Sequence, residues 1–181
     1  MRWEQLFEDL EAFAEATERQ AFDADVADRG RAERASLALT DRLRGHLEAE
    51  LGFRLLGGER VRGRLLDLGA DWALVDDGGP VVLPLAAVSA VEGLSRLAAP
   101  TTQALPRTVR VTVVLRRLGR DRAPVRITLL DGAVLTGTID RVGADHLDLA
   151  QHAPDEVRRA GAVRGVAVVR LAALAHVRAA A

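Results

Sequence analysis

RGRLLDLGADW at residues 62–72 is repeated as TGTIDRVGADH at residues 136–146, which lies 74 positions further along the chain. Both copies place a glycine two residues into the pattern and close on Gly-Ala-Asp, after which an apolar alternation follows. A second match, LAAVSAV at 85–91 with LAALAHV at 171–177, comes at an offset of 86, so the second copy carries twelve extra residues between about 150 and 163. An internal repeat of this kind indicates a structural unit that is used twice.

The composition is that of a globular protein, because 49% of the 181 residues are hydrophobic and 28% are charged. No apolar run reaches the roughly 18–20 residues that span a bilayer. The N-terminus is amphipathic and unlike a signal peptide, so we expect a cytoplasmic protein. Cysteine is absent, which excludes disulfides, thiolate metal sites and cysteine nucleophiles.

The charges are unevenly distributed along the chain. Residues 1–52 hold 13 acids and 7 arginines, whereas residues 99–181 hold 7 acids and 13 arginines. Lysine does not occur, and the richness in alanine, valine, leucine and arginine is typical of a G+C-rich genome. The asymmetry indicates either a polyanion bound to the basic part, or docking of the acidic part on the basic part, or two solvated faces of opposite sign.

The first 52 residues are expected to form a helical hairpin. Apolar residues at three- and four-residue steps predict a first helix whose apolar face is a candidate assembly face; they are Trp3, Leu6, Phe7, Leu10 and Phe13. Residues 21–50 indicate a second helical region. Its later part has an apolar face at Leu37, Leu39, Leu43, Leu47 and Leu51, and Gly52 suits a C-terminal cap. The hairpin is a candidate for dimerisation.

From residue 53 the apolar period becomes two, which predicts strands. Five short strands are expected, at 53–56, 60–68, 72–75, 81–83 and 88–92. A 3₁₀ turn is expected at 84–87, and interior glycines such as Gly63 mark sharp bends. These features predict a small, strongly bent antiparallel barrel over 53–94.

A second barrel is predicted after a linker at 95–107, which is rich in proline and threonine. Residues 108–123 alternate like a strand but also fit a helix, and we favour a basic helix because a helix precedes the first barrel. The second barrel then covers 124–178, with an insert at 151–163. Its strands are expected at 125–130, 133–142, 146–150, 166–171 and 174–178. The predicted fold is therefore α+β, with an N-terminal helical region followed by two five-stranded barrels.

VRITLLDGAVLTGTI at 125–139 resembles the first motif of the Sm-like family of SH3-like small barrels, and LGGERVRGRL at 56–65 repeats it. The resemblance covers about 53–93 and 124–178, and it implies a tandem bacterial Sm-like protein in which a helix precedes each bent barrel. Sm-like proteins commonly bind single-stranded RNA and assemble into rings through sheet edges. A tandem copy disfavours a ring of identical single barrels, so the two barrels of this chain are candidates to pair with each other.

The RNA pocket of the family is not matched. That pocket combines an aromatic residue or histidine with an asparagine after the second strand, and an arginine-glycine pair near the end. Trp72 and His146 stand at the loop position and are candidate nucleic-acid contacts. However, the chain contains no asparagine and the late strands have no arginine-glycine pair. The resemblance therefore implies the barrel without its RNA pocket.

Catalytic or metal chemistry is not expected. Asp71 and Asp145 are predicted to cap backbone N–H groups of their own loops, and Trp72 is predicted to be partly buried core. The carboxylate pairs Asp67/Asp71 and Asp140/Asp145 lie on hairpin surfaces with no evident pocket. The histidines lack metal-ligand spacing, no serine sits in a nucleophile motif, and a phosphate-binding loop is excluded without lysine. We expect no cofactor, no metal and no small-molecule substrate; the histidines are His46, His146, His152 and His176.

An arginine cluster is the strongest candidate site for a nucleic acid, because a basic helix can contact phosphates. It consists of Arg107, Arg110, Arg116, Arg117, Arg120, Arg122 and Arg126. The competing interpretation is that these arginines pair with the acidic N-terminal region of the same or another subunit.

Two functions remain in view. The preferred hypothesis is a non-enzymatic interaction or scaffold protein that self-associates or binds another protein. The alternative is a nucleic-acid-binding regulator, with RNA favoured over DNA, that uses the arginine cluster.

Overall fold

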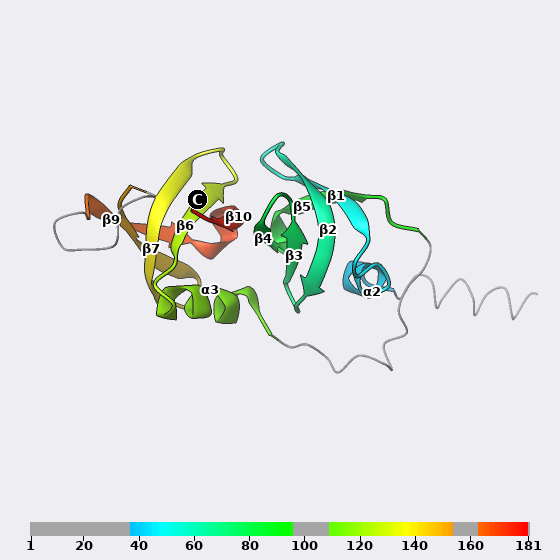
Figure 1. The fold of residues 1–181 in the computed structure, drawn as a ribbon, viewed down its shortest axis with the longest axis horizontal. Helices are drawn as coiled ribbons and strands as arrows, with labels where there is room; N and C mark the ends of the chain where they lie inside the picture. Colours follow the sequence, from blue (N-terminus) through cyan, green and yellow to red (C-terminus); the bar gives the residue numbers. More distant parts are fainter. Residues whose placement is uncertain (1–36, 96–108, 154–162, 181) are drawn as a thin grey trace, which may run out of the picture. The chain divides into compact units, whose positions relative to one another are not determined.

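The computed structural model describes residues 37–95, 109–153 and 163–180. All helices and strands below belong to the unit formed by residues 39–181. We call residues 39–95 the first half and residues 109–180 the second half. The architecture is mostly antiparallel sheet with few helices (Figure 1).

The first half consists of a short helix, four strands, a 3₁₀ turn and a final strand. In order they are α2 (Leu39–Arg44), β1 (Glu50–Leu55), β2 (Arg60–Leu68), β3 (Trp72–Asp76), β4 (Pro80–Pro84), η1 (Leu85–Ala87) and β5 (Val88–Glu92). In β1 the burial alternates, so that Leu51, Phe53 and Leu55 point into the core. This alternation is the physical expression of the two-residue apolar period.

The second half repeats this order. Its elements are α3 (Val111–Arg120), β6 (Pro124–Leu129), β7 (Val134–Val142), β8 (His146–Gln151), β9 (Gly165–Arg170), η2 (Leu171–Ala173) and β10 (Leu174–Ala179). The ambiguous segment after the linker is thus a helix, as the repeat indicates. The predicted strands of both copies are present with small shifts at their ends.

The strands form one sheet instead of two separate ones. Its ten strands run in the order β5-β1-β2-β3-β4-β10-β6-β7-β8-β9, and every neighbouring pair is antiparallel. The prediction of two separate barrels is corrected in this respect, because β4 of the first half pairs with β10 of the second. The two halves were candidates to pair with each other, and they do so within one chain through β4 and β10.

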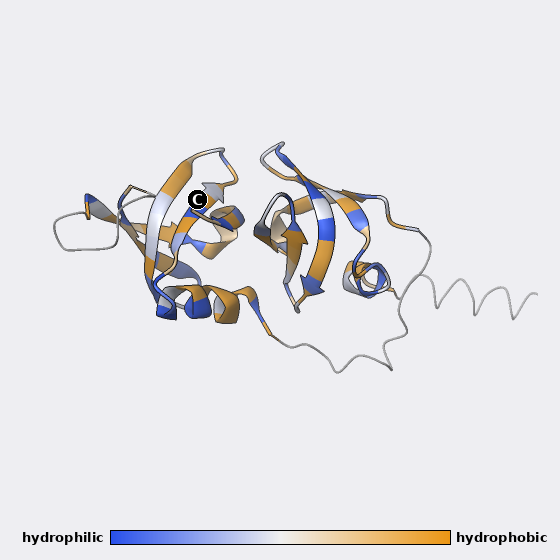
Figure 2. Ribbon diagram, in the orientation of Figure 1, coloured by the Kyte–Doolittle hydropathy of each residue, from blue (hydrophilic) through white to orange (hydrophobic). Residues whose placement is uncertain are grey.

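Two hydrophobic clusters lie along the sheet, one for each half. The first is centred on Phe53 and Leu65 and the second on Ile127 and Leu149, all four of which are at most 1% exposed. The clusters exchange residues, since Trp72 and Val82 of the first half pack in the second cluster and Ala175 of β10 packs in the first. In Figure 2 hydrophobic and hydrophilic colours alternate along the strands, and α3 changes from hydrophobic at its start to hydrophilic at its end.

The two repeated glycines sit where the second strand of each half passes closest to its neighbour. A Cβ atom on Gly63 would meet the carbonyl oxygen of Asp76, and one on Gly137 would meet that of Ala150. The pattern Gly-x-(Leu/Ile) therefore has a steric cause in both copies, because a side chain at the glycine would push β3 or β8 away.

The helix expected to continue to residue 50 is corrected by the structure. It ends at Arg44, Glu48 has a positive φ of 67°, and β1 begins at Glu50. Leu47 is exposed, and Gly52 lies inside β1 instead of capping a helix. The reason is that Leu51 completes the alternation with Phe53 and fills the first cluster, a gain that outweighs continuing the helix.

Other predictions fall outside the described residues. These are the N-terminal stripe from Trp3 to Phe13, the linker predicted at 95–107 apart from its first residue, and the greater part of the insert, 154–162. None of the described helices is both long and apolar enough to cross a bilayer.

Candidate functional site

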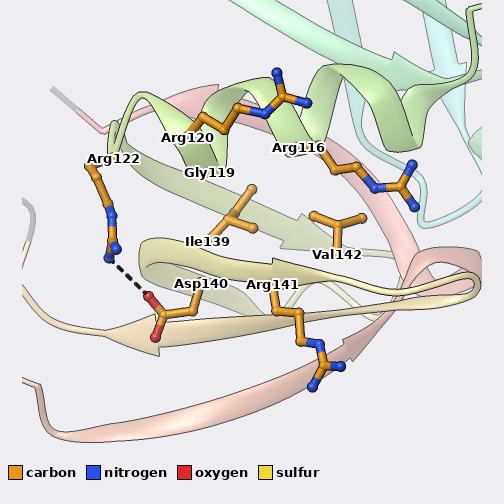
Figure 3. A pocket seen from close by; sticks show the side chains of 8 residues that line it. All are labelled: Arg116, Gly119, Arg120, Arg122, Ile139, Asp140, Arg141 and Val142. Carbon is orange, nitrogen blue, oxygen red and sulfur yellow. Dashed lines mark ion pairs between the residues drawn. The ribbon is translucent and has the colours of Figure 1, made fainter.

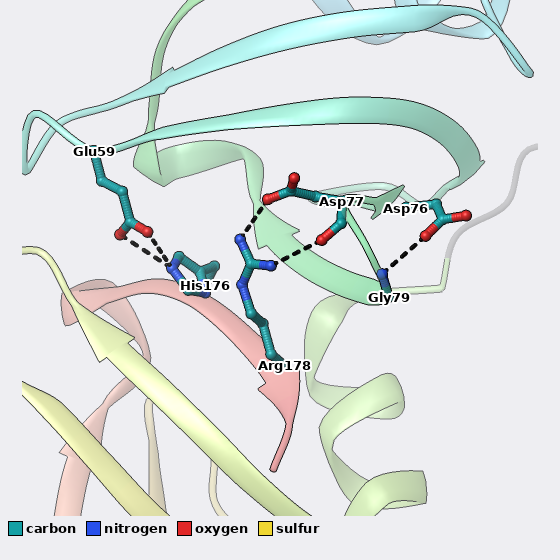
Figure 4. Close-up of polar contacts among 6 residues, drawn as sticks. All are labelled: Glu59, Asp76, Asp77, Gly79, His176 and Arg178. Atoms are coloured by element: carbon teal, nitrogen blue, oxygen red, sulfur yellow. Dashed lines mark hydrogen bonds and ion pairs between the residues drawn. The ribbon is translucent and has the colours of Figure 1, made fainter. Parts of the chain in front are cut away.

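The two halves meet where β4 pairs with β10, and we call this contact the joint. Val82 is opposite Val177 and Val81 is opposite Arg178. The Arg178 guanidinium donates to the carboxylate of Asp77 at 2.7 Å and to its backbone carbonyl at 3.2 Å (Figure 4). Because both side chains are partly buried, this bidentate contact holds the start of β4 against the end of β10.

A histidine forms the second polar contact of the joint. His176 of β10 is 2% exposed, and its Nε2 lies 3.0 Å from both carboxylate oxygens of Glu59 (Figure 4). Glu59 belongs to the turn before β2, so the contact crosses from one half to the other. The other ring nitrogen, Nδ1, is buried without a hydrogen-bond partner. This unpaired nitrogen lowers the stability of the joint, because it has lost its hydrogen bond to water.

The turn from β2 into β3, formed by residues 69–71 and by Trp72 at the start of β3, holds the start of α3; we call it the first corner. The backbone N–H of Val111 donates to Asp71 Oδ1 at 2.7 Å. The carbonyl of Val109 accepts from the Trp72 indole N–H at 2.9 Å and from the N–H of Ala70 at 3.0 Å. The first corner is therefore a socket for a helix N-terminus.

This geometry corrects the prediction that Asp71 caps its own loop. The carboxylate instead caps a helix from 40 positions away in the sequence. Trp72 is 6% exposed and packs in the second cluster, so it is core as expected, and its indole is mostly covered by protein instead of open to a base.

The matching turn of the second half, formed by residues 143–145 and by His146 at the start of β8, has the same backbone hydrogen bonds; we call it the second corner. Gly143 N–H donates to the His146 carbonyl at 2.8 Å, as Gly69 N–H does to that of Trp72 at 2.9 Å. The N–H of the residue that opens the following 3₁₀ turn donates to the aspartate carbonyl at 2.8 Å in both corners. The two loops are thus built alike.

The side chains of the second corner are exposed instead of engaged by a helix. Asp145 and His146 bond to each other, with Oδ1 and Nδ1 2.8 Å apart, and their side chains are 82% and 41% exposed. The hydrogen bond from His146, with its charge as a further cause, holds the pKa of Asp145 below its ordinary value of 3.8.

In the repeat, the two strands at the ends of the sheet correspond to the two strands that form the joint. Within the described residues, β9 pairs only with β8 and β5 only with β1. β9 corresponds to β4 and β5 corresponds to β10 in the repeat. Val168 of β9 is 67% exposed, whereas its counterpart Val82 is 7% exposed because β10 covers it.

The structure separates the predicted arginine cluster into several places. Arg116, Arg120 and Arg122 line a pocket of about 390 Å³ between α3 and β7 (Figure 3). Arg117 lies on another side of α3, beside a hollow of about 690 Å³ that Trp72 and Arg120 also line. Arg126 lines a third hollow, Arg110 is exposed at the start of α3, and Arg107 is outside the described residues.

The pocket between α3 and β7 contains one arginine that sequence reasoning missed, Arg141. Arg122 turns to Asp140, with 3.6 Å between its guanidinium and the carboxylate, while the other guanidiniums extend away from one another (Figure 3). A Cβ on Gly119 would lie 3.1 Å from the Ile139 carbonyl oxygen, so this glycine lets the helix approach β7. No local pattern marks Arg141 as basic, because its counterpart in the repeat is Asp67.

The histidines have separate structural partners. His46 contacts the Arg42 carbonyl and Ser95, and His152 contacts Thr138 Oγ1 at 2.8 Å. No group of three or more metal-ligating side chains gathers within the described parts of the chain. We identify no residues among them that would hold a metal or cofactor.

No protein-family model matches the chain, and no curated protein matches it. Three features of the chain could serve a function: the joint, its two exposed counterparts at the ends of the sheet, and the arginine pocket.

Proposed function

We propose that the chain is a non-enzymatic scaffold protein built on tandem Sm-like barrels, and that it assembles head to tail with copies of itself. The Sm-like interpretation is supported by the strand order of each half. A helix is followed by five bent strands, and the last strand returns beside the first: β5 pairs with β1 and β10 pairs with β6. In both halves a glycine in the second strand allows the sharp bend.

The observation that carries the proposal is the correspondence between the joint and the ends of the sheet. The joint pairs the fourth strand of one half with the fifth strand of the other. The same two kinds of strand, β9 and β5, stand at the two ends of the sheet. A second copy can therefore add its β5 to β9 by the arrangement that the chain already uses internally.

Burial supports the same arrangement. Val168 is 67% exposed where its covered counterpart Val82 is 7% exposed, and Val166 on the same strand is 61% exposed. On the other edge, Ala90 is exposed whereas its counterpart His176 is buried. Pairing of β9 with β5 would cover both sets, and removal of apolar area from water favours association.

The interface is of the head-to-tail kind, since the two surfaces that meet are different. Such an interface forms a ring when its rotation closes and a filament when it does not. The proposal therefore predicts a concentration-dependent series of species larger than one chain.

Sedimentation velocity over a range of protein concentrations tests the proposal. The variant is Val168→Lys, which places a charge on the open edge and should disfavour strand addition. The matched control is Val134→Lys, because Val134 is also a valine and is 54% exposed, but lies on β7 between two paired strands.

We expect the wild type and Val134→Lys to self-associate alike and Val168→Lys to sediment as one chain. A wild type that sediments as a single chain at every concentration would refute the proposal. Equal association of both variants would show that assembly uses another surface.

A second candidate function, a nucleic-acid-binding regulator, is favoured by one observation. The pocket between α3 and β7 is lined by four arginines, Arg116, Arg120, Arg122 and Arg141, and Asp140 is the one acid in its lining. Side chains of this kind can converge on phosphate groups, and their contribution would weaken with salt.

Fluorescence anisotropy with single-stranded RNA and DNA, at roughly 50 and 200 mM salt, tests the second candidate. The variant Arg116→Ser/Arg141→Ser removes two pocket arginines. The control Arg110→Ser/Arg126→Ser removes the same charge from positions outside the pocket. Selective loss in the first variant supports this function; equal losses, or no binding at low salt, exclude the pocket as its site.

A further inference from the structure

We propose that the second corner is a docking site for helix α2 of a second copy, which it holds as the first corner holds α3. This inference rests on the proposed head-to-tail assembly and names a second contact within it. The first corner gives the template, because it holds a helix start with a carboxylate cap, an aromatic N–H and a backbone N–H.

The second corner has the groups that are needed to hold the start of a helix. Its backbone hydrogen bonds match those of the first corner. Gly143 lies against the His146 ring as Gly69 lies against the Trp72 ring, since a Cβ on either glycine would strike that ring. In the imidazolium form of a histidine both ring nitrogens carry N–H groups, so Nε2 of His146 can donate to a carbonyl in place of an indole N–H while Nδ1 keeps its hydrogen bond to Asp145.

The carboxylate of the second corner is available to a helix. Asp145 keeps one hydrogen bond to His146 through Oδ1. An ionised carboxylate accepts several hydrogen bonds, so Asp145 can receive a helix N–H while His146 remains beside it. Its side chain is 82% exposed, and no described residue covers it with a helix start.

The occupant is identified by the repeat. α2 precedes the first strand of the first half as α3 precedes that of the second, and each helix buries one leucine completely, Leu43 in α2 and Leu115 in α3. Four residues before these anchors stand Leu39 and Val111. Val111 is 7% exposed beside the first corner, whereas Leu39 is 41% exposed.

The difference in exposure between Leu39 and Val111 indicates that Leu39 lacks a covering surface. Val111 packs with Trp72 in the second cluster, so the corner supplies its cover. Leu39 has no such cover from the described residues of its own chain, and the second corner of another copy is the matching surface.

Both contacts arise from one placement of the two copies. In the chain itself, the joint pairs β4 with β10 and the first corner, which joins β2 to β3 beside β4, receives α3. A second copy that adds β5 to β9 by the same arrangement brings its α2 to the second corner. The strand contact and the helix contact therefore support each other.

Two substitutions of opposite expected effect test the inference by sedimentation equilibrium on the full chain. Asp145→Ala removes the cap and should weaken self-association about fivefold. His146→Trp copies the first corner and should tighten self-association severalfold, because an indole adds apolar contact and keeps an N–H donor. Asp121→Ala, with the same charge change at the exposed end of α3 and outside both the corner and the β9 edge, is the control and should leave association unchanged.

The outcomes separate this inference from the proposed assembly. If Val168→Lys prevents association while Asp145→Ala and His146→Trp leave the affinity unchanged, the edges assemble and the corner does not dock a helix. If the wild type does not associate at all, both fail. Weakening by Asp145→Ala together with tightening by His146→Trp supports the corner, and thermal denaturation of each variant establishes that it is folded.

Discussion

At the scale of single residues, two aspartates with the same sequence neighbours have different roles. Asp71 caps α3 through the N–H of Val111, whereas Asp145 bonds to the adjacent His146. Both follow Gly-Ala in the repeat, so their local sequence is nearly the same. The difference lies in what the rest of the chain brings to each corner.

The first prediction compares these two aspartates. Asp71→Ala should lower the free energy of unfolding by about 1 kcal/mol, because it removes a helix cap. Asp145→Ala should change it much less than Asp71→Ala does, because the Asp145 side chain is exposed. Urea denaturation at a concentration where the chain is monomeric measures both; similar values for the two would contradict the assigned cap.

The second prediction concerns the protonation of Asp145. Its pKa in the folded chain lies below 3.8 because His146 donates a hydrogen bond to it. The stabilisation from this pair is therefore present above the ordinary value and is lost as the pH falls through the lowered pKa. An NMR titration of the carboxyl carbon should show this midpoint, and His146→Ala should return the midpoint towards 3.8. An unchanged midpoint in the variant would show that His146 is not the cause.

At the scale of elements, different physical causes bend the long strands and make α3 a helix. The bends follow from glycines that leave room for a neighbouring carbonyl. The segment of α3 is compatible with strand and helix, and its helical form is supported by the cap from Asp71 and by burial of Leu115. Local pattern determines the first feature and long-range contacts the second.

The third prediction tests the bend of β2. Gly63→Ala should destabilise the fold by about 1–3 kcal/mol, because the new Cβ would strike the carbonyl of Asp76. Gly52→Ala is the matched control in β1, since its Cβ would lie 3.5 Å from that of Glu92, an ordinary contact. Chemical denaturation should separate the two variants clearly. A tolerated Gly63→Ala would mean that β3 can move away without cost.

At the scale of the whole molecule, the proposed contact between copies differs from the joint in the signs of its charges. The joint joins Arg178 of β10 to Asp77 before β4. On the open edges, Glu92 stands at the position of Arg178, and Arg164 lies before β9 next to the position that matches Asp77. An exchange of signs would help β5 to recognise β9.

The fourth prediction is a charge exchange across this contact. Glu92→Arg and Arg164→Glu should each weaken self-association about two- to fivefold, the range of an exposed ion pair. The double variant should recover most of the affinity, and a double-mutant cycle from sedimentation equilibrium measures the coupling. Purely additive losses would show that these residues do not meet. Glu92 also contacts Arg54 at 3.2 Å, so Arg54→Ser serves as the control for that lost pair.

The amino-acid sequence predicts the repeated unit, most strand positions, the first 3₁₀ turn and the glycine bends, because two-residue alternation and steric limits act locally. The three-dimensional structure was needed to establish that the ten strands form one sheet, that α2 ends before Leu51, and that the arginines separate around α3. It also decided that Asp71 caps a distant helix and Asp145 does not. These features depend on contacts between residues far apart in the chain, and no local pattern distinguishes one copy of a repeat from the other.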